Sequence, residues 1–199
     1  MNSEQKRYRD RATRAMRELL KEKKLYGHIH DGGGKRYLVG MYFLLAGDIQ
    51  KAAEAFDWFY AEFPDDVGEP IQHLYSALAA YRSGDFGTAE KRLKEAMVSN
   101  VYLLPHIIQE EIHTEGIWHS SNWRSEAYLD EVREFLEEPN QQERAWITAQ
   151  FHTATFQELM NGYLATYRAL NSEDNVERRG AILDEWHTLQ RAHIQHSGV

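Results

Sequence analysis

Residues 26–40, "YGHIHDGGGKRYLVG", combine two patterns that bind metals or phosphates in other proteins. His28 and His30 alternate, and alternate residues of an extended strand can both ligate zinc. Three glycines then lead into Lys35, as in loops that bind phosphates through backbone amides. The first question is whether this stretch is an active site or a joint between two helices.

Neither pattern is complete. A Walker loop requires Gly-x4-Gly-Lys-Ser/Thr, but its first glycine would stand at Ile29, and Arg36 follows the lysine. Zinc sites built on a His-x-His strand need further ligands downstream, and no strand pattern follows. We therefore expect a glycine-rich linker over residues 27–34 with solvated histidines, and neither a phosphate loop nor a metal site.

The segment "PHIIQEEIH" contains a second possible metal pattern. On a helix, His106, Glu110 and His113 would share one face, and Glu-x-x-His is a spacing used in di-iron bundles. Such bundles need a second copy, and Asp184-x-x-His187 is a poor one. A structural or surface role is favoured, so we expect no catalytic residue, no metal and no cofactor.

The segment "GIWHSSNW" is a candidate binding edge. Trp118, His119 and Trp123 could present aromatic rings with a polar rim to a partner. No acid stands nearby to complete a Ser–His triad. The alternative is that both tryptophans cover the end of a helical array.

Helical periodicity dominates the rest of the chain. Residues 153–170 and 176–194 carry apolar positions every three or four residues, and no segment alternates like a strand. Residues 1–26 form a charged helix with one apolar stripe, made of Tyr8, Ala12, Ala15, Met16, Leu19 and Leu20. We expect an all-α protein.

The net charge of −8 is unevenly distributed. Residues 1–25 hold nine Lys or Arg and four acids, and the other 174 residues hold 14 and 27. A basic arm of +5 thus precedes an acidic body of −13. We expect the arm to fold back on the body, and binding of nucleic acid or an anionic membrane is the alternative.

Composition bears on the compartment. The chain has no cysteine, which excludes disulfides and thiolate sites. Its first 25 residues lack the apolar segment of a secretory signal, and no apolar run approaches the roughly 20 residues of a membrane span. We expect a cytoplasmic protein without membrane contact.

An internal repeat organises the middle of the chain. "AGDIQKAAEAF" and "SGDFGTAEKRL" share a Gly-Asp pair and an alanine, and Gly47 and Gly84 are 37 residues apart. A glycine ends a helix in the left-handed conformation, and the following aspartate can cap the next helix. A repeat of this length indicates stacked helix pairs.

Here the sequence resembles the tetratricopeptide repeat (TPR) family. The first unit matches that motif at Gly40, Phe43, Ala52, Phe56 and Pro64, and departs from it at Phe59. The second unit matches it at Ala77, Ala89, Leu93 and Ala96. The resemblance implies TPR-like antiparallel helix pairs over residues 35–139, two clear and one degenerate, with capping helices over residues 140–199.

The resemblance also implies a concave face on the first helix of each pair. By spacing, this face holds Tyr37, Met41, Leu44, Leu45, Leu74, Leu78, Tyr81 and Arg82. We expect a non-catalytic interaction module that holds an unidentified protein or peptide there, unless the chain's own helices fill the face. Nucleic-acid binding through the basic arm comes second and a metal-dependent enzyme third, and homo-oligomers stay open.

Overall fold

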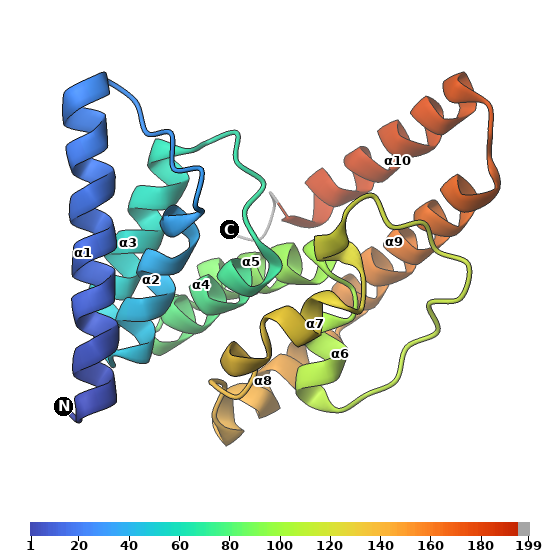
Figure 1. Cartoon of the computed structure of the whole chain (residues 1–199). Coiled ribbons are helices and arrows are strands. Elements are labelled where there is room, and N and C mark those ends of the chain that lie inside the picture. Colours follow the sequence, from blue (N-terminus) through green and yellow to red (C-terminus); the bar gives the residue numbers. More distant parts are fainter. Residues whose placement is uncertain (195–199) are drawn as a thin grey trace. The chain divides into compact units, whose positions relative to one another are not determined.

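The computed structural model describes residues 1–194 (Figure 1). These residues form ten α-helices and two short 3-10 segments, Asn122–Arg124 and Arg133–Phe135, and contain no strand. The all-α prediction is therefore confirmed. None of the helices in the described part of the chain has the length and apolar content that a membrane span requires.

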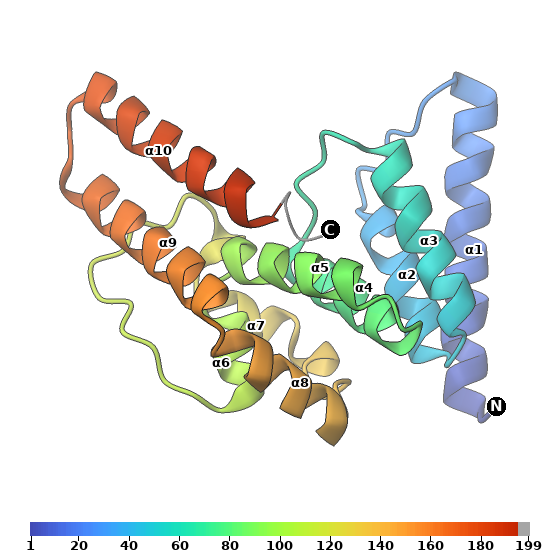
Figure 2. The same ribbon diagram turned by 180° about the vertical axis from the view of Figure 1, so that it is seen from behind.

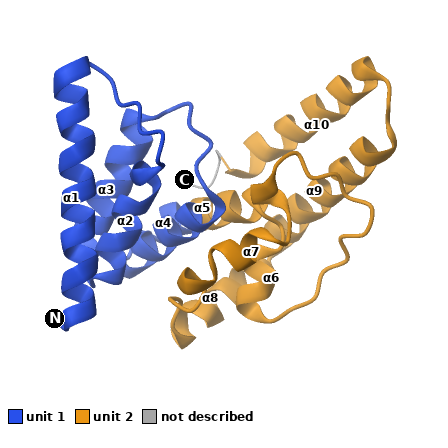
Figure 3. Cartoon of the chain, viewed as in Figure 1, with its two compact units in different colours: residues 1–89 blue, residues 90–199 orange. Residues whose placement is uncertain are grey.

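The chain divides into two compact units, residues 1–89 and residues 90–199 (Figure 3). The boundary lies within α5 (Phe86–Ser99), inside the region where the sequence predicts repeats. Unit 1 holds 13 Lys or Arg and 13 Asp or Glu, whereas unit 2 holds 10 and 18. The whole net charge of −8 thus belongs to unit 2.

Unit 1 is built around its second helix (Figures 1 and 2). Its four complete helices are α1 (Ser3–Tyr26), α2 (Lys35–Leu45), α3 (Ile49–Glu62) and α4 (Pro70–Arg82). The other three all pack against α2, and α4 also packs against α3. Because α2 has neighbours on several sides, most of its residues are apolar and buried.

The basic arm folds onto its own unit, as predicted. A capping box between Asn2 and Gln5 starts α1, and Gly27 in the left-handed conformation ends it. Its stripe faces α2: Ala12 is fully buried, and the ring of Tyr8 lies 5.7 Å from that of Tyr42. Leu20, predicted to belong to this stripe, is instead 46% exposed.

The two Gly-Asp turns have the same backbone geometry. Gly47 and Gly84 both have a positive φ, 76° and 80°. The Asp48 amide donates to the Phe43 carbonyl at 3.0 Å, and the Asp85 amide donates to that of Ala80 at 2.9 Å. The two donors are 37 residues apart in the sequence, and so are the two acceptors. The sequence repeat is therefore a structural repeat at these turns.

Each aspartate then begins the next helix. The Asp48 carboxylate accepts from the Lys51 amide at 3.3 Å, and the Asp85 carboxylate accepts from the Thr88 amide at 3.0 Å. The amide of Thr88 lowers the pKa of Asp85, because the hydrogen bond stabilises the charged form. The predicted roles of glycine and aspartate are confirmed at both turns.

Unit 2 contains short helices followed by a long hairpin (Figure 2). Its helices are α6 (Leu103–Ile108), α7 (Tyr128–Glu131), α8 (Gln141–Phe151), α9 (Ala154–Ser172) and α10 (Val176–Ile194). The last two pack against each other, and a Cβ at Gly162 would lie 2.2 Å from Leu189. Glycine is therefore needed where these two helices approach. Over the predicted third repeat, two short helices and two 3-10 segments stand in place of a long helix pair.

Gly40→Ala should destabilise unit 1. A Cβ at this position would lie 2.7 Å from the buried ring of Phe56. Overpacking of this kind costs about 1–3 kcal/mol, more than the gain of up to about 1 kcal/mol from alanine over glycine in a helix. Urea unfolding followed by circular dichroism measures the difference.

Gly87→Ala is the matched control, because the nearest atom to its added Cβ is the Asp85 carboxylate oxygen at 3.9 Å. This variant should be at least as stable as the wild type. Equal stability of the two variants would contradict the close approach of α2 and α3 at Gly40.

Candidate functional site

The predicted concave face is mostly internal. Tyr37, Met41, Leu44, Leu74 and Leu78 are buried. Leu45, Tyr81 and Arg82 keep partial exposure. Four of the eight residues belong to α2, on which α1 packs. The five buried side chains are not available to a partner in this conformation.

Tyr37 belongs to a polar network at the start of α2. Its hydroxyl lies 3.0 Å from both carboxylate oxygens of Asp66 and accepts from Arg36 at 2.5 Å. Burial, with the charge of Asp66, raises the pKa of Tyr37 to about 12. Burial alone would raise the pKa of Asp66, yet hydrogen bonds from the Gly68 amide, Arg36 and Tyr37 lower it. A neutral tyrosine and a charged aspartate thus join the start of α2 to the loop before α4.

The linker over residues 27–34 is anchored by Asp31. Its buried carboxylate accepts from the amides of Lys35 at 3.0 Å and Arg36 at 2.7 Å. A carboxylate at these amides satisfies the free donors of α2. These two hydrogen bonds hold the end of the linker against the first turn of α2.

The two linker histidines face each other. The Nε2 atoms of His28 and His30 lie 2.7 Å apart, and their rings meet edge to face at 4.3 Å. Both side chains are exposed. Throughout residues 1–194, no three His, Cys, Asp or Glu side chains gather to hold a metal ion. The pair therefore stands without the further ligands of a zinc site.

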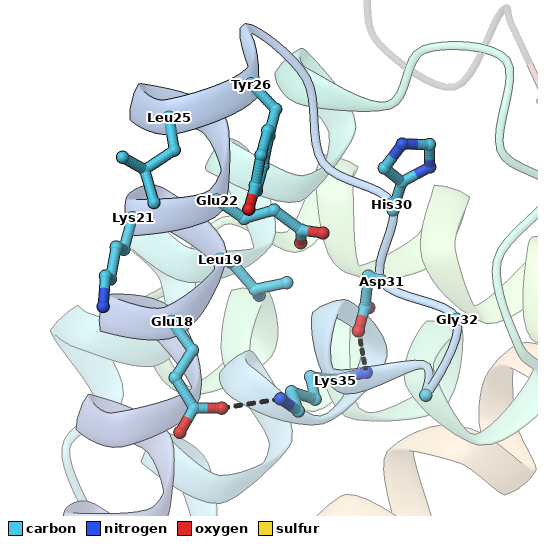
Figure 4. A pocket seen from close by; sticks show the side chains of 11 residues that line it. Glu18, Leu19, Lys21, Glu22, Leu25, Tyr26, His30, Asp31, Gly32 and Lys35 are labelled. Atoms are coloured by element: carbon cyan, nitrogen blue, oxygen red, sulfur yellow. Dashed lines mark hydrogen bonds and ion pairs between the residues drawn. The ribbon is translucent and has the colours of Figure 1, made fainter.

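A hollow of about 450 Å³ lies between the second half of α1 and this linker (Figure 4). Glu18 and Lys35 form an ion pair across it at 2.6 Å. The hydrogen bond to Lys35 lowers the pKa of Glu18, and the same bond raises that of Lys35. Both side chains are about half exposed, so this pair contributes little to stability. The other polar lining residues are Lys21, Glu22, Tyr26, His30 and Asp31.

The predicted face of His106, Glu110 and His113 does not form. The helix ends at Ile108, because Gln109 adopts the left-handed conformation with φ 60°. Glu110 then pairs with the His152 ring nitrogen at 2.7 Å, and His113 is exposed on the following loop. The helical spacing assumed for this segment was wrong.

The predicted edge, residues 118–123, packs against other residues of unit 2. The Trp118 amide donates to the Tyr167 carbonyl at 2.9 Å, and its ring stacks on that of Tyr167. Arg179 lies 5.1 Å above the same indole. His119 contacts the hydroxyl of Tyr102, and Trp123 accepts at its carbonyl from buried Asn100 at 2.7 Å. Trp118 thus packs on α9 through one face of its ring, while 37% of its surface stays exposed.

Tyr163 lies beneath this edge and is fully buried. Its ring stacks on Tyr167 at 4.3 Å, and the guanidinium of Arg124 lies 5.9 Å from it. Burial raises the pKa of Tyr163 to about 12, although Arg124 opposes the shift. The hydroxyl is therefore held protonated in the folded unit.

An apolar groove of about 500 Å³ is lined by α1, α2 and α3 of unit 1. We call it the basic-rimmed groove. Its floor is Met16, Leu20 and Phe43, and its rim is Thr13, Arg17, Lys21, Lys24 and Lys51. Four cations and no acid thus surround an apolar floor.

Sequence reasoning missed this groove. It assigned Leu20 to the buried stripe of the arm and Phe43 to the repeat motif, and Lys51 lies 30 residues beyond Lys21 in the chain. One feature of the sequence could have indicated it. Leu20 lies about 100° around the helix from Leu19, so the apolar stripe is too wide for both side chains to be buried, and Leu19 is the buried one.

Asp31→Ala should destabilise the protein by about 1–2 kcal/mol at pH 7, because two amides of α2 lose their acceptor. His30→Ala in the same loop should change the free energy of unfolding by less than about 0.5 kcal/mol. Urea unfolding measures both. A larger loss for His30→Ala would mean that the histidine pair holds the linker.

Tyr163→Phe should reduce the loss of stability at alkaline pH. The pKa of Tyr163 is about 12 when folded and about 10 when unfolded, so its contribution is complete below pH 10 and declines above it. Between pH 9 and pH 11 the wild type should lose about 1 kcal/mol more than the variant. Tyr26→Phe, which removes an exposed hydroxyl, should follow the wild type in the same urea titrations.

Comparison with known proteins identifies no relative of this chain. No protein-family model, no curated protein and no solved structure matches the chain. The similarity to the TPR motif therefore stays a prediction from the residues, and the function has to be inferred from the surfaces described above.

Proposed function

We propose that this chain is a non-catalytic protein-interaction module and that a partner protein binds in the basic-rimmed groove of unit 1. The observation that carries the proposal is the exposure of apolar floor within a concave surface. Leu20 is 46% exposed beside Met16, and Phe43 closes the floor beneath them. Concave apolar surfaces with a polar rim are typical of sites for partners.

The proposal includes a TPR-like organisation of unit 1. Three features support it: the identical turns at Gly47 and Gly84, the packing of α4 against both α2 and α3, and the close approach of Gly40 to Phe56. A small residue facing an aromatic ring is what the resemblance implies for the two helices of one pair. Fold similarity alone would not name a function, so the proposal rests on the groove.

The proposed site differs from the concave face expected from the sequence. That face places five side chains in the core, whereas the groove has open apolar area. The absence of cysteine supports a reducing compartment, so we place the interaction in the cytoplasm.

Affinity capture from nuclease-treated lysate tests the function. Wild type, Leu20→Asp and Val176→Asp should be compared by quantitative mass spectrometry after circular dichroism has confirmed folding. Val176 is 81% exposed in unit 2 and serves as the matched control. Burying the aspartate charge against an apolar partner surface costs free energy. Leu20→Asp should therefore reduce the amount of captured partner at least about tenfold.

A stoichiometric protein that is lost with Leu20→Asp and kept with Val176→Asp is the expected result. A protein set that is the same for all three chains would contradict binding in the groove. Turnover of a substrate by the purified wild type would contradict the non-catalytic reading.

A further inference from the structure

We propose that the segment bound in the basic-rimmed groove is an acidic amphipathic α-helix of about three turns. This inference rests on the proposed function and specifies the chemistry of the partner. The shape of the floor, the charge of the rim and the length of the groove each constrain the occupant.

The floor sets the apolar side of the occupant. Met16 and Leu20 are four residues apart on α1 and therefore present neighbouring side chains on one face of the helix. Phe43 comes from the last turn of α2 and is only 7% exposed. Such a floor accepts two or three apolar side chains that project from a ridge, as the i, i+4 and i+7 positions of a helix do.

The rim sets the charge of the occupant. The ion pairs of α1 within residues 1–194 do not include Arg17, Lys21 or Lys24. Lys51 lies 3.8 Å from Asp48 and 5.8 Å from the ring of Phe43, so its charge is partly shared. Since no acid lines the groove, a partner with Glu or Asp beside its apolar residues would supply the missing charges.

The geometry favours an acidic helix over an anionic membrane or a nucleic acid. An anionic membrane would pair with the rim through its headgroups, whereas a helix can also place apolar side chains against Phe43, which is only 7% exposed. A nucleic acid would use the cations through its phosphates and would leave the apolar floor uncovered. The lining of α1 runs from Thr13 to Lys24, which is about 17 Å at 1.5 Å per residue, or three helical turns.

The walls of the groove are formed before binding, because α1 packs along α2. Arg9 pairs with Asp48 at 3.5 Å near one end of α1, and Lys23 pairs with Glu62 near the other. These pairs tie α1 to both ends of α3 (Ile49–Glu62). A preformed groove lowers the ordering cost of binding, which favours a short helix as ligand.

Direct binding to designed peptides tests the inference. The probe is a fluorescein-labelled 14-residue peptide with leucines at i, i+4 and i+7 and glutamates beside them, stapled to hold the helix. A second peptide carries lysine in place of every glutamate. Fluorescence polarisation compares wild type, Lys21→Glu/Lys24→Glu, and the control Lys6→Glu/Arg14→Glu, which reverses two charges of α1 outside the groove.

The acidic peptide should bind the wild type with a dissociation constant of about 1–100 µM, and binding should weaken several-fold between 50 and 500 mM salt. The groove variant should bind it at least about tenfold more weakly, and the control variant within about twofold. The lysine peptide should bind only the groove variant. This exchange of preference distinguishes charge recognition from damage to the fold.

Other outcomes would overturn the inference. Equal binding of both peptides, or none, would exclude an acidic helix. Tighter binding of anionic vesicles or single-stranded RNA, lost in the groove variant alone, would assign the groove to that surface. A dimer in sedimentation that the groove variant abolishes would assign it to a second copy. If the peptide fails while capture still depends on Leu20, the proposed function stands and only the partner's chemistry is wrong.

Discussion

Unit 1 depends on the burial of α2, the helix against which α1, α3 and α4 all pack. An apolar helix in this position must satisfy both of its ends without water. Asp31 supplies the acceptor at the first turn, and the left-handed Gly47 closes the last. Gly40 then lets Phe56 approach the middle of the helix. Because α2 is covered in this way, the apolar side chain that stays exposed at the basic-rimmed groove is Leu20 of α1.

The parts that the sequence predicted well depend on local chemistry. Helical periodicity identified the long helices α1, α9 and α10, because an amphipathic stripe depends only on the spacing of apolar residues within one segment. The two Gly-Asp turns were recognised because a left-handed glycine and a capping aspartate act over four residues. The role of Asp31 as acceptor for the first amides of α2 was not recognised from the sequence.

The parts that the sequence did not predict depend on contacts between distant residues. Nothing in "PHIIQEEIH" marks Gln109 for the left-handed conformation, since glutamine is not a typical residue there. The five buried residues of the predicted concave face could be placed on a helix face, but whether a neighbour covers that face is a tertiary property. The groove combines α1 with Phe43 and Lys51, which no spacing rule connects. The site proposed from the structure therefore differs from the face that was predicted from the sequence.

The division of charge between the units has a practical consequence for the isolated parts. Unit 1 has as many cationic as anionic side chains, so a fragment of residues 1–89 would be close to its isoelectric point at neutral pH. Proteins near zero net charge lose the mutual repulsion that keeps them dispersed. Unit 2 carries eight excess negative charges, and this net charge would keep the whole chain soluble. The colloidal behaviour of the groove-bearing half is thus set by residues outside it.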